Sequence, residues 1–325
     1  MKEIRILFLC WVASVCVVAA SENPVFSSGS SVHPGASPSD YRAILWSGET
    51  FVAARSDGCI DRISPGGTLL GSTKVSEKAF HCLLAFGQYL VAAGEGGQLW
   101  IAEGRGPFVQ KDSGTVHTIE ALTFFKGLMI AGTSGRSLLT ASPPGVFRPV
   151  LLDLKGNVLS LSAGTEMCYG VTDAGEILRT RDGIHWSLFD FNREYAGYYL
   201  PCTFTSVALA PGRIAVSGTK SDGSPVLMLS TRGNVWMERP LDYSDPAGGF
   251  SLLKQIPEFV WYDPSGDQWV LVCRGGHLMT LPACSQCNRL TVLSSEDLRG
   301  MAANGKVWMV VGDHSFLHLL PAFFP

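Results

Sequence analysis

Charged residues are scarce in this sequence. Only 16% of its 325 residues are Asp, Glu, Lys or Arg, and the formal net charge is −3. No block of Lys and Arg stands out along the chain, whereas a nucleic-acid-binding face or a segment that docks on an anionic membrane surface needs one. We therefore expect no nucleic-acid partner.

Sequence motifs of catalysis and cofactor binding are also missing. The chain has no GxSxG, no P-loop and no GxGxxG after a strand. Its single CxxC pair, Cys284 and Cys287, lacks the further ligands that a zinc site needs. His314 and His318 fall on one predicted strand, about 13 Å apart at about 3.3 Å per residue, which is too far for one metal ion. We predict no catalytic residue, no cofactor and no bound metal.

Long apolar runs are confined to the N-terminus. Residues 1–20 combine a charged start, an apolar run and small residues before Ser21. This pattern predicts a cleaved signal peptide, with a signal anchor as the alternative. No later segment approaches membrane-spanning length. We therefore expect a secreted, periplasmic or cell-envelope protein with no stable membrane span after signal cleavage.

Cysteine is too sparse for a small disulfide-rich scaffold. Two of the nine Cys, Cys10 and Cys16, lie in the predicted signal peptide. The seven that remain are an odd number, so at least one thiol stays unpaired in an oxidising compartment. The sequence leaves the pairing open, including whether Cys284 and Cys287 bond to each other.

Glycine, by contrast, is abundant and recurs at regular intervals. The 36 Gly and 18 Pro suit many short strands joined by tight turns. One unit repeats: two apolar strands, a Gly turn, a third strand, a second turn and a bulky residue. Gly supplies the positive φ that such hairpin turns need. The successive turns end at Gly58, Gly97, Gly135, Gly175, Gly223, Gly276 and Ser315. The steps between these residues are 39, 38, 40, 48, 53 and 39.

A bulky residue marks the start of each fourth strand. The spacing is 39 residues from Leu69 to Phe108, Phe147 and Trp186, and Trp236 follows after 50. A repeat of about forty residues with four strands is typical of a β-propeller blade. A β-sandwich also has evenly spaced strands, but it does not need one unit copied at a constant period. We predict an all-β, seven-bladed propeller of four-stranded blades, in a single domain spanning residues 21–325.

The seventh unit lacks a fourth strand. The chain ends ten residues after Ser315, whereas the fourth strand of other units starts 11 to 13 residues after the turn. An open ring would leave unpaired strand edges, which is costly. Residues 23–29 carry Phe26 where a bulky residue is wanted. We predict that this segment closes the ring as the missing outer strand, with residues 21–40 forming the closing strand and its linker.

Two turns share a more specific pattern. "TRDGIHW" (180–186) resembles the Asp-box of the bacterial neuraminidase repeat, and "STRGNVW" (230–236) matches the same frame with Arg232 at the Asp position. The resemblance implies a secreted Asp-box propeller, a group that includes sialidases, sortilin-type receptors and photosystem II assembly factors. It also implies that the box is a structural turn and that His185 faces solvent. The residues assigned to this role are Thr180, Asp182, Gly183, Trp186, Ser230, Gly233 and Trp236.

Sialidase activity is not expected from this resemblance. The sialidase fold has six blades, and its first Arg motif precedes the first box. The nearest match here, "FRPV" (147–150), falls instead at the outer strand of the third unit.

Insertions are the better guide to a binding surface, because regular repeats carry little functional information. Links 189–202 and 239–257 are longer than the others, and the turn within 217–225 is enlarged. All three are expected on one sector of one face. Tyr and Arg suit a recognition surface, although the same aromatics would also serve to pack the links onto the ring. The candidate binding residues are Phe191, Arg193, Tyr195, Tyr198, Tyr199, Asp242 and Tyr243.

These observations favour an exported, non-catalytic propeller that binds or scaffolds another protein. The alternative is a carbohydrate-binding or glycosidase-like propeller that uses its central face, and a glycan remains a possible partner. An enzyme should show convergent carboxylates or Arg around the centre, whereas a scaffold should show an aromatic patch away from it. An assembly factor would show a basic patch on the ring.

Overall fold

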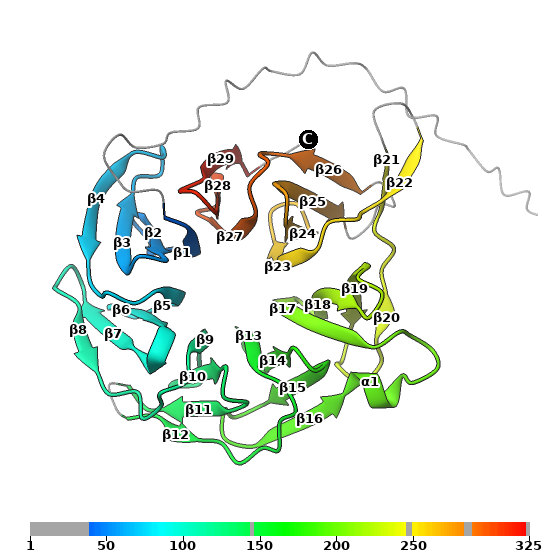
Figure 1. Ribbon diagram of the computed structural model, residues 1–325, viewed down its shortest axis with the longest axis horizontal. Helices are drawn as coiled ribbons and strands as arrows, with labels where there is room; N and C mark the ends of the chain where they lie inside the picture. The colour runs from blue at the N-terminus through cyan, green and yellow to red at the C-terminus, as the bar shows by residue number, and fades with distance from the viewer. Residues whose placement is uncertain (1–38, 144–145, 245–248, 283–287, 323–325) are drawn as a thin grey trace, which may run out of the picture.

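The chain forms a ring of seven antiparallel sheets. The computed structural model describes residues 39–143, 146–244, 249–282 and 288–322. Six of the ring's sheets have four strands, and the last has three within these residues. The sheets follow one another round a common centre, from the blue N-terminal blade to the red C-terminal one (Figure 1). The predicted seven-bladed propeller is confirmed.

Blades 1 to 3 follow the repeat read from the sequence. Each runs from an inner strand near the centre to an outer strand at the rim (Figure 1). Blade 1 contains β1 (Tyr41–Trp46), β2 (Phe51–Arg55), β3 (Cys59–Ile63) and β4 (Leu69–Lys74). Blade 2 contains β5 (Phe80–Phe86), β6 (Tyr89–Gly94), the 3₁₀ turn η1 (Glu95–Gly97), β7 (Leu99–Glu103) and β8 (Val109–Lys111). Blade 3 contains β9 (Ile119–Phe125), β10 (Leu128–Thr133), β11 (Leu138–Ala141) and β12 (Arg148–Pro149).

Blades 4 to 7 keep the same order. Blade 4 contains β13 (Val158–Ala163), β14 (Cys168–Thr172), β15 (Glu176–Thr180) and β16 (Trp186–Asp190). Blade 5 contains β17 (Cys202–Ala210), β18 (Arg213–Lys220), β19 (Pro225–Ser230) and β20 (Met237–Glu238). Blade 6 contains β23 (Pro257–Asp263), β24 (Gln268–Cys273), β25 (His277–Pro282) and β26 (Arg289–Val292). Blade 7 contains β27 (Leu298–Ala303), β28 (Val307–Gly312) and β29 (Leu317–Pro321).

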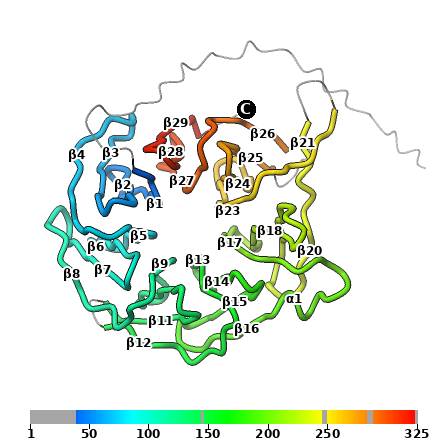
Figure 2. Tube along the Cα trace, in the orientation of Figure 1, coloured from blue at the N-terminus to red at the C-terminus, as the bar shows by residue number. Residues whose placement is uncertain are grey.

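Two elements stand outside the blades. A short helix, α1 (Phe191–Glu194), follows blade 4, and a hairpin of β21 (Asp242–Ser244) and β22 (Phe250–Leu252) follows blade 5. The hairpin projects from the rim of the ring, as the chain trace shows (Figure 2). Both lie in the long links found in the sequence.

The second strand of each blade has a run of buried residues, because a neighbouring blade covers each of its faces. Every residue of β2, β14 and β24 is buried. A short continuous apolar run is the expected pattern for a strand enclosed on both faces. The outer strands alternate or are exposed, and β4 is exposed along most of its length.

The bulky residue before or at each outer strand joins neighbouring blades. Each one packs in an apolar cluster between its own blade and the preceding blade. The regular spacing in the sequence therefore reflects one packing contact made repeatedly around the ring. These residues are Leu69, Phe108, Phe147, Trp186 and Trp236.

One backbone hydrogen bond recurs in all seven blades and defines a face of the ring. The amide that follows the second strand donates to the carbonyl just before the first strand. The links between blades and the turns between second and third strands therefore share one face, which we call the link face. The donor and acceptor pairs are Ser56–Asp40, Glu95–Ala79, Ser134–Thr118, Asp173–Asn157, Ser221–Pro201, Arg274–Ile256 and Asp313–Asp297.

The ring closes between blades 1 and 7, where β1 packs against β27. The amide of Ser315 donates to the Ser39 carbonyl at 3.0 Å, and the Ser315 hydroxyl donates to the same oxygen at 2.9 Å. His314 donates its amide to Asp40 Oδ1 at 3.1 Å. His314 and Ser315 have φ of 53° and 60°, a left-handed conformation that costs about 1–2 kcal/mol in a residue with a Cβ. These contacts hold the seam together. The predicted closing segment 23–29, with Phe26, lies outside the described residues and stays a prediction, as does the signal peptide over 1–20.

Phe26→Asp tests the closing strand. If Phe26 packs at the outer edge of blade 7, the change should lower the free energy of unfolding by about 3 kcal/mol, the cost of losing a buried aromatic side chain. Urea unfolding measures it. Phe250→Asp is the matched control, because Phe250 is 76% exposed. Equal stability of the two variants would remove Phe26 from the ring.

Candidate functional site

The link from blade 4 to blade 5 is fixed to the turns of both blades. Helix α1 begins after Asp190, whose carboxylate accepts from the Arg193 amide at 3.1 Å. Asn192 Nδ2 donates to the carbonyls of Ala174 at 3.0 Å and Cys202 at 2.9 Å. The link therefore lies on the link face in a defined position.

Three of its aromatic residues pack the link onto the ring. Phe191 is fully buried, and its ring contacts Tyr195 and Tyr199 at centroid distances of 4.8 and 5.9 Å. The Tyr195 hydroxyl accepts from the Trp236 amide at 2.8 Å. Phe191 therefore supports the link and has no surface to offer a partner, as the packing interpretation of these aromatics requires.

Tyr198 is different, because 84% of it is exposed at the outer bend of the same link. Leu200 beside it is 47% exposed. The Arg193 side chain is also largely exposed and forms an ion pair with Glu194 at 2.8 Å. Of the predicted recognition residues on this link, Tyr198 and Arg193 are thus the ones that face solvent.

The second link exposes an apolar pair that the sequence analysis did not predict. Asp242 and Tyr243 are half-buried, and the Asp242 carbonyl accepts from Asn288 Nδ2 at 2.7 Å. Tyr243 packs against the apolar cluster between blades 5 and 6. The exposed side chains are instead Phe250, at 76%, and Leu252, at 67%. Their alternation around Ser251 was a sequence signal for one exposed strand face.

We call the exposed residues Tyr198, Leu200, Phe250 and Leu252 the rim surface. Its two parts lie on neighbouring parts of the rim, with β19 and β20 between them (Figures 1 and 2). The enlarged turn between β18 and β19 is on the same face, where Ser221 donates its amide to the Pro201 carbonyl at 2.7 Å. The three enlargements thus share the sector of blades 4 to 6.

The 180–186 turn is built from its own polar groups. The Thr180 hydroxyl accepts from the Gly183 amide at 2.9 Å, and Asp182 Oδ1 accepts from the amides of Ile184 and His185 at 2.9 and 2.8 Å. The His185 imidazole, with Nδ1 2.7 Å from the other oxygen, and these amide bonds hold the pKa of Asp182 well below its usual range. The His185 side chain is 87% exposed, as predicted.

The 230–236 turn has the same backbone shape as the 180–186 turn but lacks a carboxylate at the position of Asp182. The Ser230 hydroxyl accepts from the Gly233 amide at 2.8 Å, the counterpart of the Thr180 bond. Gly233 has a φ of 70° against 79° for Gly183. Arg232 stands where Asp182 makes its turn bonds.

Every inner strand carries an extra residue in its first half. The register of the first two strands shifts by one position in each blade, as a β-bulge does. Five of the seven extra residues are ionisable, which the sequence alone did not reveal, because a bulge cannot be read from alternation. They are Arg42, His81, Glu120, Leu159, Thr205, Glu258 and Arg299.

The charged bulge residues are paired. His81 Nδ1 lies 2.8 Å from Glu120 Oε2 across blades 2 and 3. Arg299 lies within 3.7 Å of Glu258 across blades 7 and 6, and Arg42 bonds Asp40 at 2.9 Å.

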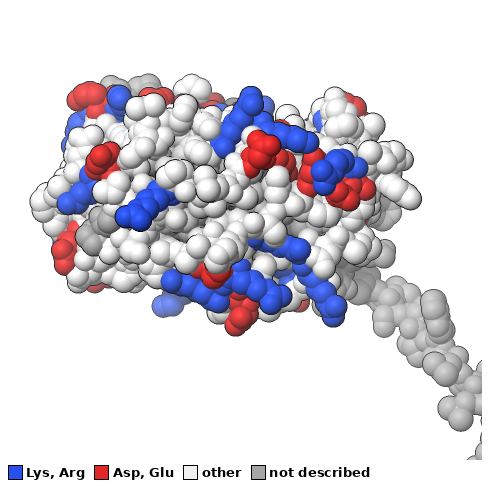
Figure 3. Space-filling view, turned by 90° about the horizontal axis from the view of Figure 1, so that it is seen from below, with Lys and Arg blue, Asp and Glu red and all other residues white. Residues whose placement is uncertain are grey.

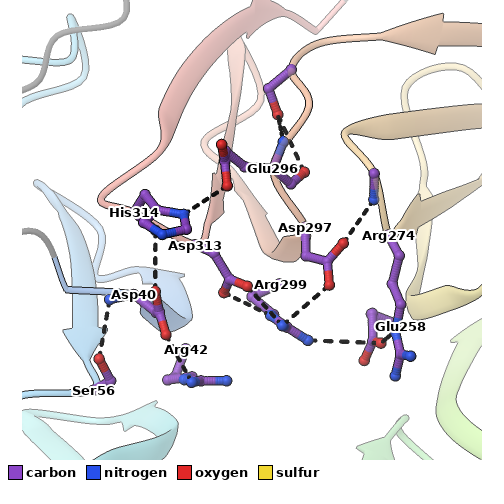
Figure 4. A network of polar contacts seen from close by, with 12 residues as sticks. Asp40, Arg42, Ser56, Glu258, Arg274, Glu296, Asp297, Arg299, Asp313 and His314 are labelled. Atoms are coloured by element: carbon purple, nitrogen blue, oxygen red, sulfur yellow. Dashed lines mark hydrogen bonds and ion pairs between the residues drawn. The ribbon is translucent and has the colours of Figure 1, made fainter.

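Around the seam these pairs extend into a network over blades 6, 7 and 1 (Figure 4). Arg299 bonds both oxygens of Asp313 at 2.8 Å, and His314 Nδ1 lies 2.6 Å from Glu296 Oε2. Arg299 holds the pKa of Asp313 below its ordinary value, and Glu296 raises the pKa of His314. The convergent charges at this part of the ring are thus engaged in ion pairs, mostly within one blade. The Arg299–Glu258 pair joins blades 7 and 6, and the bond from the His314 amide to Asp40 joins blades 7 and 1.

No metal or membrane feature accompanies these residues. Across 39–143, 146–244, 249–282 and 288–322, no three His, Cys, Asp or Glu side chains are grouped to hold a metal ion. In the same ranges, no helix has the length and hydropathy needed to cross a membrane. Cys284 and Cys287 fall outside the described residues.

Comparison with known proteins shows the fold and no family. No family model matches the chain, and no curated protein matches it. Among solved structures it is similar to U3-55K, with 12% identity, a TM-score of 0.69, and 88% of this chain and 96% of that chain covered. It is likewise similar to the WD40 repeats of RRP9, at 13% identity, TM-score 0.69 and coverage of 88% and 95%. It is also similar to the WD40 propeller domain of Doa1, with 10% identity, a TM-score of 0.67, and 86% of this chain and 92% of that chain covered.

Tyr195→Phe should show that Tyr195 is structural. It leaves the Trp236 amide without its acceptor, so the free energy of unfolding should fall by about 1–2 kcal/mol. The control Tyr198→Phe should change it by less than about 0.5 kcal/mol, since its side chain is exposed. Thermal or urea unfolding compares the two, and equal effects would contradict the assignment.

Arg299→Gln should raise the pKa of Asp313 toward about 3.9, its ordinary value. A carboxyl group whose pKa is lower in the folded state than in the unfolded state stabilises the fold at any pH above its unfolded-state pKa. This stabilisation is lost as the pH falls through the folded-state pKa. The variant should therefore be less stable than wild type at pH 7, by about 1.5–3 kcal/mol, and the difference should shrink below pH of about 4. NMR titration of Asp313 and urea unfolding across pH test this. A stability difference that is independent of pH would contradict it.

Proposed function

We propose that this chain is a non-catalytic scaffold that binds another protein through the rim surface. The observation that carries the proposal is the exposure of Tyr198 and Phe250 on the two elaborated links of a rigid ring. Large aromatic side chains held in the open on well-packed supports are typical of anchors in protein interfaces. The buried Phe191 and Tyr195 supply that support on the first link.

The charges at the seam favour a scaffold over an enzyme. Catalytic carboxylates need an arrangement in which their charge is free to act on a substrate. Here Asp313, Asp297 and Glu258 are each bonded to Arg299 or Arg274. This pairing weighs against a glycosidase at the central face.

We also propose that the protein is exported and belongs with Asp-box propellers. The pattern of residues 1–20 supports export, and the bonds of Thr180 and Asp182 support a box turn. The five described cysteines are unpaired, and four are buried. Burial raises the pKa of Cys168 to about 12 and of Cys202 to about 11, which keeps these thiols protonated and unreactive. Unpaired cysteines of this kind are compatible with an oxidising compartment.

Tyr198→Ser combined with Phe250→Ser tests the rim surface. We expect capture of a partner from the native cell envelope to fall about tenfold or more, since each lost aromatic anchor costs on the order of 1 kcal/mol. Quantitative affinity capture with mass spectrometry measures it.

The matched control is Val116→Ser combined with Leu151→Ser, which removes apolar side chains that are 82% and 96% exposed in other links. A partner lost equally from both double variants would not use the rim surface. Specific binding on a glycan array, together with no protein captured, would favour the carbohydrate alternative.

A further inference from the structure

A second surface lies between blades 4 and 5, on the face opposite the links. A pocket of about 680 Å³ is bounded there by the 180–186 and 230–236 turns. Because strands alternate in direction, these turns between third and fourth strands open on the face away from the links. The pocket is within the size range of sites for small ligands or peptide side chains. Its cationic residues are Arg179, Arg181 and Arg232.

None of these arginines forms an ion pair with an acidic residue within the described part of the chain, and two of them form no side-chain hydrogen bond either. Within the described part of the chain, no ion pair or hydrogen bond engages the exposed side chains of Arg181 and Arg232. The one acidic residue of the pocket, Asp182, already accepts from turn amides and His185. The pocket therefore carries uncompensated positive charge on a chain whose net charge is negative. In the view onto β12 and β16, Lys and Arg side chains lie along both edges of the ring, with Asp and Glu among them (Figure 3).

The Arg232 side chain forms no bond within its own turn, because this turn has lost the Asp of the box pattern. In the first turn the residue at this position, Asp182, is bonded to the turn itself. In the second turn the Ser230 hydroxyl and Gly233 keep the backbone shape without it. The side chain at this position is thus released from a structural role, and its charge is reversed.

Arg179 is held in place between the blades. Its Nε donates to the Ser187 hydroxyl at 3.0 Å, and its guanidinium also donates to Asn234 Oδ1 on the neighbouring turn. Tyr169 lies beside it and is buried against Gly233, where a Cβ would come within 2.7 Å of the Tyr hydroxyl. This part of the pocket is therefore preorganised.

The pocket continues into an apolar cavity. A second pocket of about 580 Å³ shares Met167, Tyr169 and Thr231 with the first. It extends over the turns that join the first and second strands of both blades, with apolar walls from Leu209 and Ile214. Its charged lining residues are Glu166 and Arg213, and Arg213 already pairs with Asp267. The two cavities form one groove, cationic at the outer end and apolar at the inner end.

We propose that this groove binds an acidic segment of a protein chain, with carboxylates on Arg181 and Arg232 and an adjoining apolar side chain against Leu209. Guanidinium groups recognise carboxylates through paired hydrogen bonds, and Arg clusters are a recurring means of binding acidic motifs. An inorganic anion or a sulfated polysaccharide would use the cationic end and leave the apolar end unused. The proposal rests on the proposed role as a protein-binding scaffold, but it concerns a separate surface on the other face.

Selection of random heptapeptides displayed on phage against the folded full-length protein tests the groove. We expect the selected pool to be at least twofold enriched in Asp and Glu, with apolar neighbours. The strongest peptide should bind at least tenfold more weakly to Arg181→Gln combined with Arg232→Gln, as measured by fluorescence anisotropy. Arg289→Gln combined with Lys306→Gln removes the same charge elsewhere and should leave binding unchanged.

Arg232→Asp is the second variant, because it restores the box pattern and should fold at least as stably as wild type while losing peptide affinity. A pool without acidic enrichment, or equal affinity in the double variant, would overturn the proposal. So would heparin or inorganic phosphate binding through these arginines more tightly than the selected peptide. Retained peptide binding in the Tyr198 and Phe250 double variant separates this surface from the rim surface, so either can fail alone.

Discussion

Each blade of this ring depends on its neighbours to cover its two faces. The second strands are apolar on both sides, so a single blade would expose strands such as β14 and β24 to water. The bulky residue at each outer strand then locks one blade to the preceding one. Stability consequently depends on the contacts between neighbouring blades, as it depends on contacts between neighbouring units in other repeat architectures. The seam between blades 1 and 7 matters most, because Ser39 and Ser315 meet there without a short link between them.

The fold could be predicted because the residues that repeat in the sequence each have a structural role within their own blade or at its contact with the next. The turn Gly specifies a hairpin, and the bulky residue specifies a packing contact between two blades. Both features recur at nearly constant spacing, whatever the protein binds. The third and seventh turns depart from this rule. In the third turn Arg136, and not Gly135, takes the left-handed conformation, and in the seventh His314 and Ser315 take it without Gly. Their bonds to Asp40 and Ser39 compensate, and those partners lie more than 270 residues away in the sequence.

The candidate site was less predictable, because exposure in a long link is decided by tertiary packing. The sequence placed five candidates in the first link, and the structure divides them into the buried Phe191, the half-buried Tyr195 and Tyr199, and the exposed Tyr198 and Arg193. Phe250 and Leu252 were missed, although they alternate as a strand face does. The cationic groove was missed for a different reason. It joins Arg179 and Arg181 of one blade to Arg232 of the next, and Arg232 was noticed only as a departure from the box pattern.

The position of the seam has a geometric consequence. The described chain runs from blade 1 to blade 7, and these two blades meet at the seam. The link that begins with α1 follows blade 4, across the ring from the seam, whereas the β21–β22 hairpin follows blade 5 and lies closer to it (Figure 1). A protein bound through both links would therefore contact blades other than the two that close the ring.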